Sequence, residues 1–143
     1  KGKLDELIKN ADVLIGVSKP GIVSKEMIAS MAEDPIVFVM SNPVPEIMPD
    51  EAIEAGAAVV GTVRSDFQNQ VNNVLAFPGI FRGALDCRVS QITEEMKEAA
   101  ARAIANVIKE EDLRADYVLP DVFDKRVVEQ IVNAIKACSV KMQ

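Results

Sequence analysis

Three short apolar runs, each separated from the next by a segment of helical character, constrain the fold of this chain more than any other feature. The runs occupy residues 12–17, 36–40 and 57–62. Continuously apolar runs of this length are typical of strands that are covered on both faces, as in a parallel sheet. Strands that alternate with helices predict right-handed crossovers between neighbouring parallel strands, and therefore an α/β fold.

Residues with capping preferences delimit the predicted helices. Ser24 and Thr93 are suited to helix starts, Pro49 to a first helical position, and Gly56 to a left-handed helix end. Further helices are predicted at residues 4–8, 77–85 and 124–137, and the helix after Thr93 carries a long apolar stripe that predicts a core position. The predicted fold is a partial Rossmann-like parallel sheet flanked by helices, with a helical carboxyl-terminal region, and residues 1–143 are expected to form one domain.

Polar side chains follow each of the three predicted strands. Because parallel strands end at the same edge of a sheet, residues 18–21, 42–46 and 64–73 are expected to lie near one another, and ligands of open α/β sheets bind along that edge. These segments carry neutral amides and hydroxyls with few charges. Side-chain amides both donate and accept hydrogen bonds, which suits a carboxamide, a ribose hydroxyl or a 2-hydroxy acid.

Each candidate residue also has a purely structural interpretation. Asn42 precedes Pro43, and Asn-Pro favours turn initiation. Asn72 and Asn73 could cap a helix or lie in a solvated loop. The nearby arginines, Arg64 and Arg82, could form structural ion pairs with Asp66 or Asp86.

Composition excludes several classes of site. The chain has no histidine, which removes Ser-His and Cys-His nucleophilic sites and most zinc sites. A net charge of −6 argues against a nucleic-acid interface, and no apolar run approaches the roughly 20 residues that span a membrane. Cys87 and Cys138 have no metal-type spacing and are expected to be buried free thiols in a reducing cytosol. No glycine-rich phosphate turn is present, so the chain has the character of the later half of a dinucleotide-binding domain.

Four segments together resemble the carboxyl-terminal part of malic enzyme in its shorter bacterial or archaeal form. They are Asp-Val-Leu-Ile-Gly-Val-Ser-Lys-Pro-Gly at 12–21, Ser-Asn-Pro-Val-Pro-Glu-Ile-Met-Pro at 41–49, Arg-Ser-Asp-Phe-Gln-Asn-Gln-Val-Asn-Asn at 64–73, and Phe-Pro-Gly-Ile-Phe-Arg-Gly-Ala-Leu at 77–85. The similarity extends over about residues 11–140, and the last two segments in combination are its most specific part.

The resemblance implies an oxidoreductase that converts malate to pyruvate by oxidative decarboxylation, with NAD or NADP and a divalent metal, Mg or Mn. It implies that the cofactor passes Gly16, Val17 and Ser18. It also implies substrate-binding roles for three asparagines: Asn42 near both the nicotinamide and the substrate, and Asn72 and Asn73 at the substrate, with Asn73 preferred as the malate contact.

Departures from the family pattern limit what this chain is expected to do alone. The family's catalytic lysine and tyrosine, its acidic metal ligands and its glycine-rich turn all belong to earlier segments, and Tyr117 does not stand at the catalytic tyrosine's place. Gln68 stands where proline is expected. The chain starts at Lys1 without a methionine, which fits a processed product or an excised piece. We therefore expect no catalytic residues and no activity in the isolated chain, and a cytoplasmic, homo-oligomeric complete enzyme without membrane or nucleic-acid partners.

Two other interpretations remain open at this point. Folate-linked methylene dehydrogenases share the Ala-Asp-Val strand and the Lys-Pro-Gly turn, but the segment at 64–73 is not expected in them. A non-catalytic α/β binding module of the phosphorylatable receiver type would need acidic residues at its strand ends, whereas these strands end near Ser18 and Asn42.

Overall fold

The computed structural model describes residues 2–140, and the chain divides into two compact units, Lys1–Val71 and Asn72–Gln143. Each unit has its own cluster of buried apolar side chains, one around a sheet and one among helices. The sequence predicted one domain of ordinary size, and the described residues contain two clusters of core side chains. The assignment of residues 1–143 to a single NAD(P)-binding domain stays a prediction.

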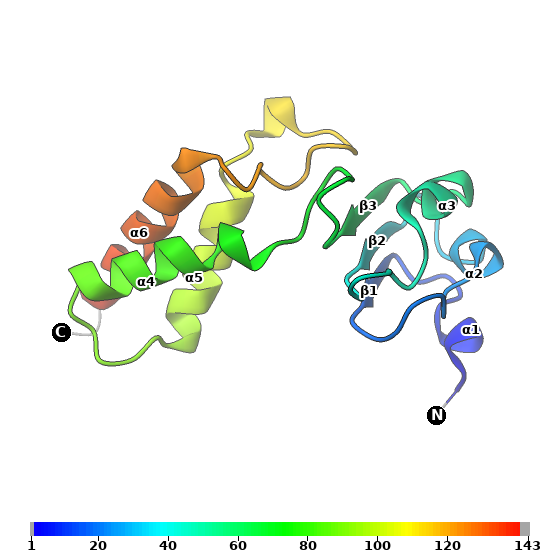
Figure 1. Ribbon diagram of the computed structural model, residues 1–143, viewed down its shortest axis with the longest axis horizontal. Coiled ribbons are helices and arrows are strands. Elements are labelled where there is room, and N and C mark those ends of the chain that lie inside the picture. The colour runs from blue at the N-terminus through cyan, green and yellow to red at the C-terminus, as the bar shows by residue number, and fades with distance from the viewer. Residues whose placement is uncertain (1, 141–143) are drawn as a thin grey trace. The chain divides into compact units, whose positions relative to one another are not determined.

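The first unit is built on a three-stranded parallel sheet in the order β1 (Val13–Gly16), β2 (Ile36–Val39) and β3 (Val59–Thr62). Gly16 pairs with Val39, and Val39 with Thr62, so the three strands end level with one another. The short helices α2 (Lys25–Ala29) and α3 (Pro49–Glu54) form the crossovers, as Figure 1 shows. The predicted α/β class and the three strands are confirmed, each strand being shorter than its apolar run.

The two faces of the sheet differ within the described residues. Val37 and Val39 are fully buried in the same core as Ile28 of α2 and Ala52 of α3. On the other face Ile15 is 63% exposed. The expectation that the strands would be covered on both faces is therefore not what the described residues show, because both crossover helices contribute to the core on one side only.

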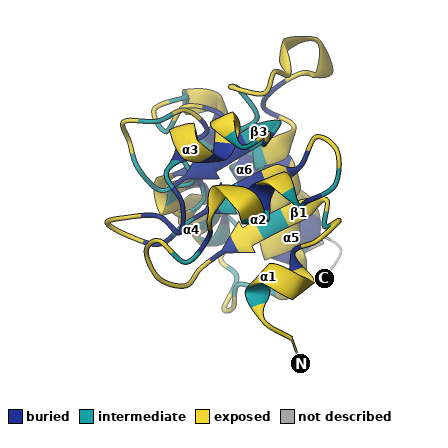
Figure 2. Ribbon diagram, turned by 90° about the vertical axis from the view of Figure 1, so that its right-hand side faces the viewer, coloured by how far each residue is buried: buried dark blue, intermediate teal, exposed yellow. Residues whose placement is uncertain are grey.

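Capping residues start the helices where the sequence places them. The Ser24 hydroxyl accepts a hydrogen bond from the Met27 amide at 3.3 Å at the start of α2, and Pro49 is the first residue of α3. Gly56 follows α3 with φ of 107°, a conformation that favours glycine. The first helix, α1 (Leu4–Leu7), buries no residue fully, and its largely exposed surface and that of α2 are visible in Figure 2.

The second unit consists of three helices, α4 (Phe77–Asp86), α5 (Glu94–Ala105) and α6 (Lys125–Val140), with the short 3₁₀ helices η1 (Asn73–Leu75) and η2 (Glu110–Asp112). Helix α6 packs against both α4 and α5. The apolar stripe of α5 is buried as predicted, with Met96 and Ala100 almost completely inaccessible. Gly79 and Gly83 let α4 approach α6 closely, because an added Cβ would lie 2.7 Å and 2.8 Å from the Cβ atoms of Ile131 and Ile135.

Two further observations concern the cysteines and the helix lengths. Cys87 is half-buried, Cys138 is buried, and both are free thiols. None of the helices described here combines the length and the apolar character needed to cross a membrane.

Candidate functional site

The loops that leave β1 and β2 are joined by the carboxylate of Glu46. This side chain is fully buried. Its Oε1 accepts a hydrogen bond from the Ser18 amide at 2.7 Å, and its Oε2 accepts one from the Ser41 amide at 3.1 Å. The expected proximity of the segments at 18–21 and 42–46 is therefore confirmed.

The backbone strengthens this connection. The Gly21 amide donates to the Pro45 carbonyl at 3.2 Å, and the Val23 amide donates to the Glu46 carbonyl at 3.1 Å. The segment after β2 thus holds the loop after β1 over several residues. Both loops line a surface hollow of about 360 Å³.

The residues named from the sequence differ in exposure at the rim of the sheet, by which we mean the edge where the loops leave β1 and β2. Gly16 is buried, whereas Val17, Ser18 and Asn42 are exposed. Asn42 precedes Pro43 through a cis peptide bond, and its side chain makes no hydrogen bond within residues 2–140. The chain bends at residues 42–44, and the exposed Asn42 amide group is available to a ligand.

The loop after β3 folds back along its own strand. The Val71 amide donates to the Thr62 carbonyl at 2.8 Å, and the buried Asn69 side chain donates through Nδ2 to the Val60 carbonyl at 3.1 Å. Asn69 therefore has a structural role. The Thr62 hydroxyl at the end of β3 is buried and has no hydrogen-bond partner among the described residues.

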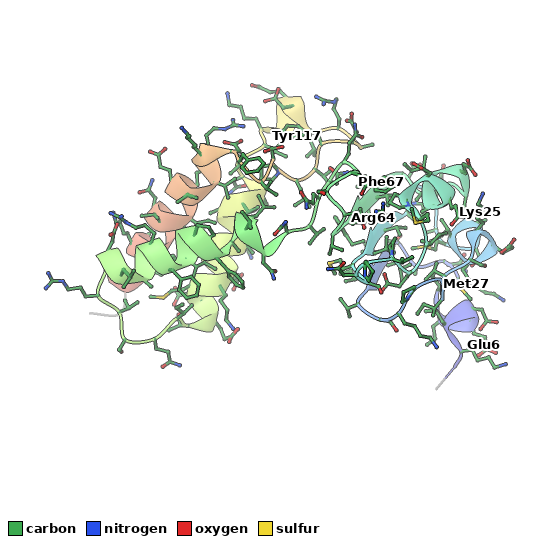
Figure 3. All side chains as sticks on the ribbon, viewed as in Figure 1. Glu6, Lys25, Met27, Arg64, Phe67 and Tyr117 are labelled. Carbon is green, nitrogen blue, oxygen red and sulfur yellow. The ribbon has the colours of Figure 1, made fainter. Side chains whose placement is uncertain are left out.

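Arg64 has a structural partner in the same loop. Its Nε and Nη2 atoms donate to the two oxygens of Asp66 at 2.9 Å and 2.6 Å, and its guanidinium lies 5.4 Å from the Phe67 ring centroid. Arg64 and Phe67 are labelled in Figure 3. Hydrogen bonds from Arg64 lower the pKa of Asp66 below its usual value. The ion-pair interpretation also describes Arg82 and Asp86 of α4, whose closest atoms are 2.9 Å apart.

Asn72 and Asn73 belong to the second unit, so their placement beside the strand-end loops stays a prediction. Asn72 caps η1, with its Oδ1 accepting from the Val74 amide at 3.0 Å. Asn73 is exposed, and its side chain makes no hydrogen bond within the described part of the chain. The capping alternative thus accounts for Asn72 and does not account for Asn73.

Sequence reasoning did not identify Glu46 as part of this site. Its signal is a single acidic residue between Pro45 and Ile47, just beyond the second strand, where the flanking residues are apolar. Buried carboxylates are rare without partners, so an acid in such a context indicates hydrogen bonding to nearby amides.

A metal site is not supported by the residues at hand. Among residues 2–140 no group of three or more cysteine, aspartate or glutamate side chains is placed to hold a metal ion. Glu46 is already engaged by two amides. The described residues therefore do not fit the divalent metal that the resemblance implies.

The parallel strands end level with one another, and the loops after β1 and β2 meet at one edge of the sheet. This arrangement is typical of α/β ligand-binding domains. Residues 1–140 match the family model described as malic enzyme, NAD binding domain. The chain is 60% identical over 140 residues to the bifunctional malic/malolactic enzyme of Bacillus subtilis, covering 98% of this chain and 34% of that protein. It is 56% identical over 135 residues to an NAD-dependent malic enzyme of Geobacillus stearothermophilus, covering 94% of this chain and 28% of that protein.

Solved structures agree with these matches. A malic enzyme from Pyrococcus horikoshii superimposes with a TM-score of 0.93 at 45% identity, over 99% of this chain and 33% of that one. An NAD-dependent malic enzyme from Thermotoga maritima gives a TM-score of 0.88 at 44% identity, over 94% of this chain and 35% of that one.

The chain belongs to the malic enzyme family, whose NAD-binding domain it matches. It spans about a third of the length of these relatives. The family match decides against the folate-linked dehydrogenase and against the receiver-type module.

Proposed function

We propose that this chain supplies the later part of the NAD(P)-binding domain in an enzyme that oxidises and decarboxylates malate to pyruvate. The observation that carries the proposal is the pair of strand-end loops joined by Glu46, which present the exposed Ser18 and Asn42 at one rim. The names of the relatives, NAD-dependent malic enzyme and malic/malolactic enzyme, support the same substrate and cofactor.

The proposed cofactor site consists of Gly16, Val17, Ser18 and Asn42. Its groups are backbone amides, a hydroxyl and a neutral side-chain amide, which suit a carboxamide and ribose hydroxyls. A nicotinamide held there would supply the acceptor for the hydride that leaves the substrate carbon. The role of this chain is to hold the cofactor beside the substrate, and positioning of this kind accounts for several kcal/mol of barrier lowering.

The proposed substrate contacts are Asn42, Asn72 and Asn73. Asn73 is the preferred malate contact because its amide is exposed and makes no side-chain hydrogen bond among residues 2–140. Asn72 uses its Oδ1 to cap η1, which leaves its NH₂ group as the donor that could reach a carboxylate.

The remaining parts of the proposal concern the complete enzyme. The chain has no histidine and its described residues have no metal-ligand group, so the Mg or Mn ion and the acid–base residues are assigned to other segments, and the isolated 143 residues are expected to be inactive. A cytoplasmic location, homo-oligomeric assembly, and the absence of membrane and nucleic-acid partners belong to the same proposal, as does the use of either NAD or NADP.

Replacement of Asn73 by alanine in the complete enzyme tests the substrate role. Loss of one hydrogen bond to malate is expected to raise the malate KM, or lower kcat, by about tenfold, which corresponds to roughly 1.4 kcal/mol. The matched control is Asn106→Ala. Asn106 is another exposed asparagine, and it caps the end of α5 with its backbone amide, which alanine retains. If Asn73→Ala left both constants at the control values, the assignment of malate to Asn73 would be wrong.

A further inference from the structure

Glu46 is a carboxylate in an unusual setting. Its side chain is fully buried and forms no ion pair among the described residues. A buried charge is costly unless hydrogen bonds satisfy it, and charge-assisted bonds from amides are among the stronger ones in proteins. Each carboxylate oxygen of Glu46 accepts one such bond, from Ser18 and from Ser41.

The two donors occupy equivalent positions. Gly16 of β1 pairs with Val39 of β2, and Ser18 and Ser41 each lie two residues beyond these paired strand ends. The backbone ladder continues to the Met40 amide, which donates to the Gly16 carbonyl at 2.9 Å. The carboxylate therefore bridges the two chains where they leave the sheet.

Gly16 provides the space for this carboxylate. A Cβ at position 16 would lie 2.8 Å from the Glu46 Cδ and 3.0 Å and 3.1 Å from its two oxygens. These distances are shorter than a carbon side chain tolerates without displacement. Any larger residue at position 16 would thus move Glu46 away from one or both amides.

From this geometry we infer that Glu46 is a positioning residue for the nicotinamide cofactor, an inference that rests on the proposed function. Glu46 holds the backbone of Ser18 against that of Ser41, so that the loop after β1 and the Asn42 amide keep one arrangement before the cofactor binds. Neither carboxylate oxygen needs to touch the cofactor for this role. The two hydrogen bonds stabilise the loop arrangement that binds the cofactor, so a larger fraction of the molecules has that arrangement before binding.

A purely structural role makes a different prediction. If Glu46 only stabilised the core, its replacement would lower the unfolding temperature and leave the cofactor dissociation constant of the folded molecules unchanged. A positioning role requires that the apparent dissociation constant rise as the competent fraction falls. Cofactor affinity of folded protein therefore separates the two roles.

The test uses the complete enzyme that carries these residues, with Glu46→Gln, Glu46→Ala and the control Glu54→Gln. Glu54 is an exposed acid of the same unit whose partner is Lys25, at 2.6 Å. Calorimetric titration with NAD and with NADP is expected to give dissociation constants raised about tenfold for Glu46→Gln, if the competent fraction falls to about a tenth, and more for Glu46→Ala. Glutamine retains one acceptor oxygen, which is the reason for the graded effect. The malate KM at saturating cofactor is expected to change less than the cofactor KM.

A double-mutant cycle with Gly16→Ala sharpens the test. Gly16→Ala alone is expected to raise the cofactor dissociation constant, since its methyl group displaces the carboxylate. In the Glu46→Ala background the same substitution is expected to add little, because the carboxylate that it displaces is gone. Additive effects of the two substitutions would contradict the inference.

Each negative result has its own meaning. If the unmodified enzyme neither bound nor reduced NAD or NADP, the proposed function would fail, and the inference with it. If the unmodified enzyme were active while folded Glu46→Gln and Glu46→Ala bound the cofactor as tightly as the control, the inference alone would fail. Should Glu46→Ala not fold, Glu46→Gln and Gly16→Ala carry the test, with faster amide exchange at Ser18 and Ser41 as the expected structural signature.

Discussion

The unit that contains the sheet buries polar side chains beside its apolar core, whereas the described part of the helical unit buries apolar side chains alone. Among the described residues all the buried polar side chains, Ser41, Glu46, Thr62 and Asn69, belong to the unit Lys1–Val71. The core of the other unit is formed by residues such as Met96, Ile131 and Ile135. Hydrogen bonds depend on the direction between donor and acceptor, whereas apolar contacts do not. The buried hydrogen bonds of the first unit therefore fix the conformations of its loops.

Glycine serves the two units differently as well. In the first unit Gly21 has φ of 66° with no atom within 4 Å of an added Cβ, so the backbone conformation and not the available space favours glycine there. In the second unit Gly83 lies within α4, where the neighbouring Ile135 leaves no room for a side chain. The choice of residue is thus limited by the backbone torsion angle at Gly21 and by the space beside the helix at Gly83.

The largest expected effect concerns the helical core. Ile131 is fully buried between α4 and α5, and Ile131→Ala is expected to lower the free energy of unfolding of the second unit by about 3 kcal/mol, within the range for such truncations. Hydrogen exchange followed by mass spectrometry, on peptides from α4, α5 and α6, measures this loss. Leu85→Ala is the control, because Leu85 is 75% exposed and its truncation is expected to cost less than about 0.5 kcal/mol. Equal losses for the two variants would show that Ile131 is not a core residue.

The two glycines give a second test. Gly83→Ala is expected to destabilise by about 1–3 kcal/mol through overpacking, despite the better helix propensity of alanine. Gly21→Ala is expected to cost about 1 kcal/mol through its left-handed backbone, and Gly21→Asn less, because asparagine tolerates that conformation. Denaturant unfolding of each variant supplies the values. A Gly83→Asn variant milder than Gly83→Ala would contradict the spatial explanation.

Much of the fold follows from local residues. The strand runs, the Ser24 and Thr93 caps, Pro49 at the start of α3 and Gly56 after it are all found where the sequence predicts them, because each depends on only a few neighbours. The uncovered sheet face and the division into two cores were not predicted, since they depend on which elements pack together across long stretches of sequence.

The same distinction applies to the site. Convergence of Ser18 and Asn42 follows from parallel strand geometry, and Asn42 was a candidate because of its residue type. Glu46 was missed because its role depends on burial, which the letters Pro-Glu-Ile do not reveal. Asn72 was proposed from the sequence, and its side chain makes a local capping hydrogen bond. Residue type alone does not decide between this capping role and a substrate contact.

The smallest expected effect compares one substitution at two threonines. The Thr62 hydroxyl is buried and has no hydrogen-bond partner among the described residues, whereas the Thr93 hydroxyl accepts from the Met96 amide at 3.3 Å and caps α5. Thr93→Val removes a cap and is expected to cost about 1 kcal/mol. Thr62→Val replaces an unsatisfied hydroxyl in a strand with a methyl group, and is expected to be neutral or to stabilise by up to about 1 kcal/mol.

Thermal unfolding of the two threonine variants beside the unmodified chain therefore gives shifts of opposite sign, or a shift for Thr93→Val alone. A loss of stability in Thr62→Val as large as that in Thr93→Val would mean that the Thr62 hydroxyl makes a stabilising hydrogen bond. The buried polar residues at the end of β3 would then all be satisfied, as Glu46 is at the ends of β1 and β2. The expected opposite result would show that the buried Thr62 hydroxyl can be removed from the described sheet unit at no cost in stability.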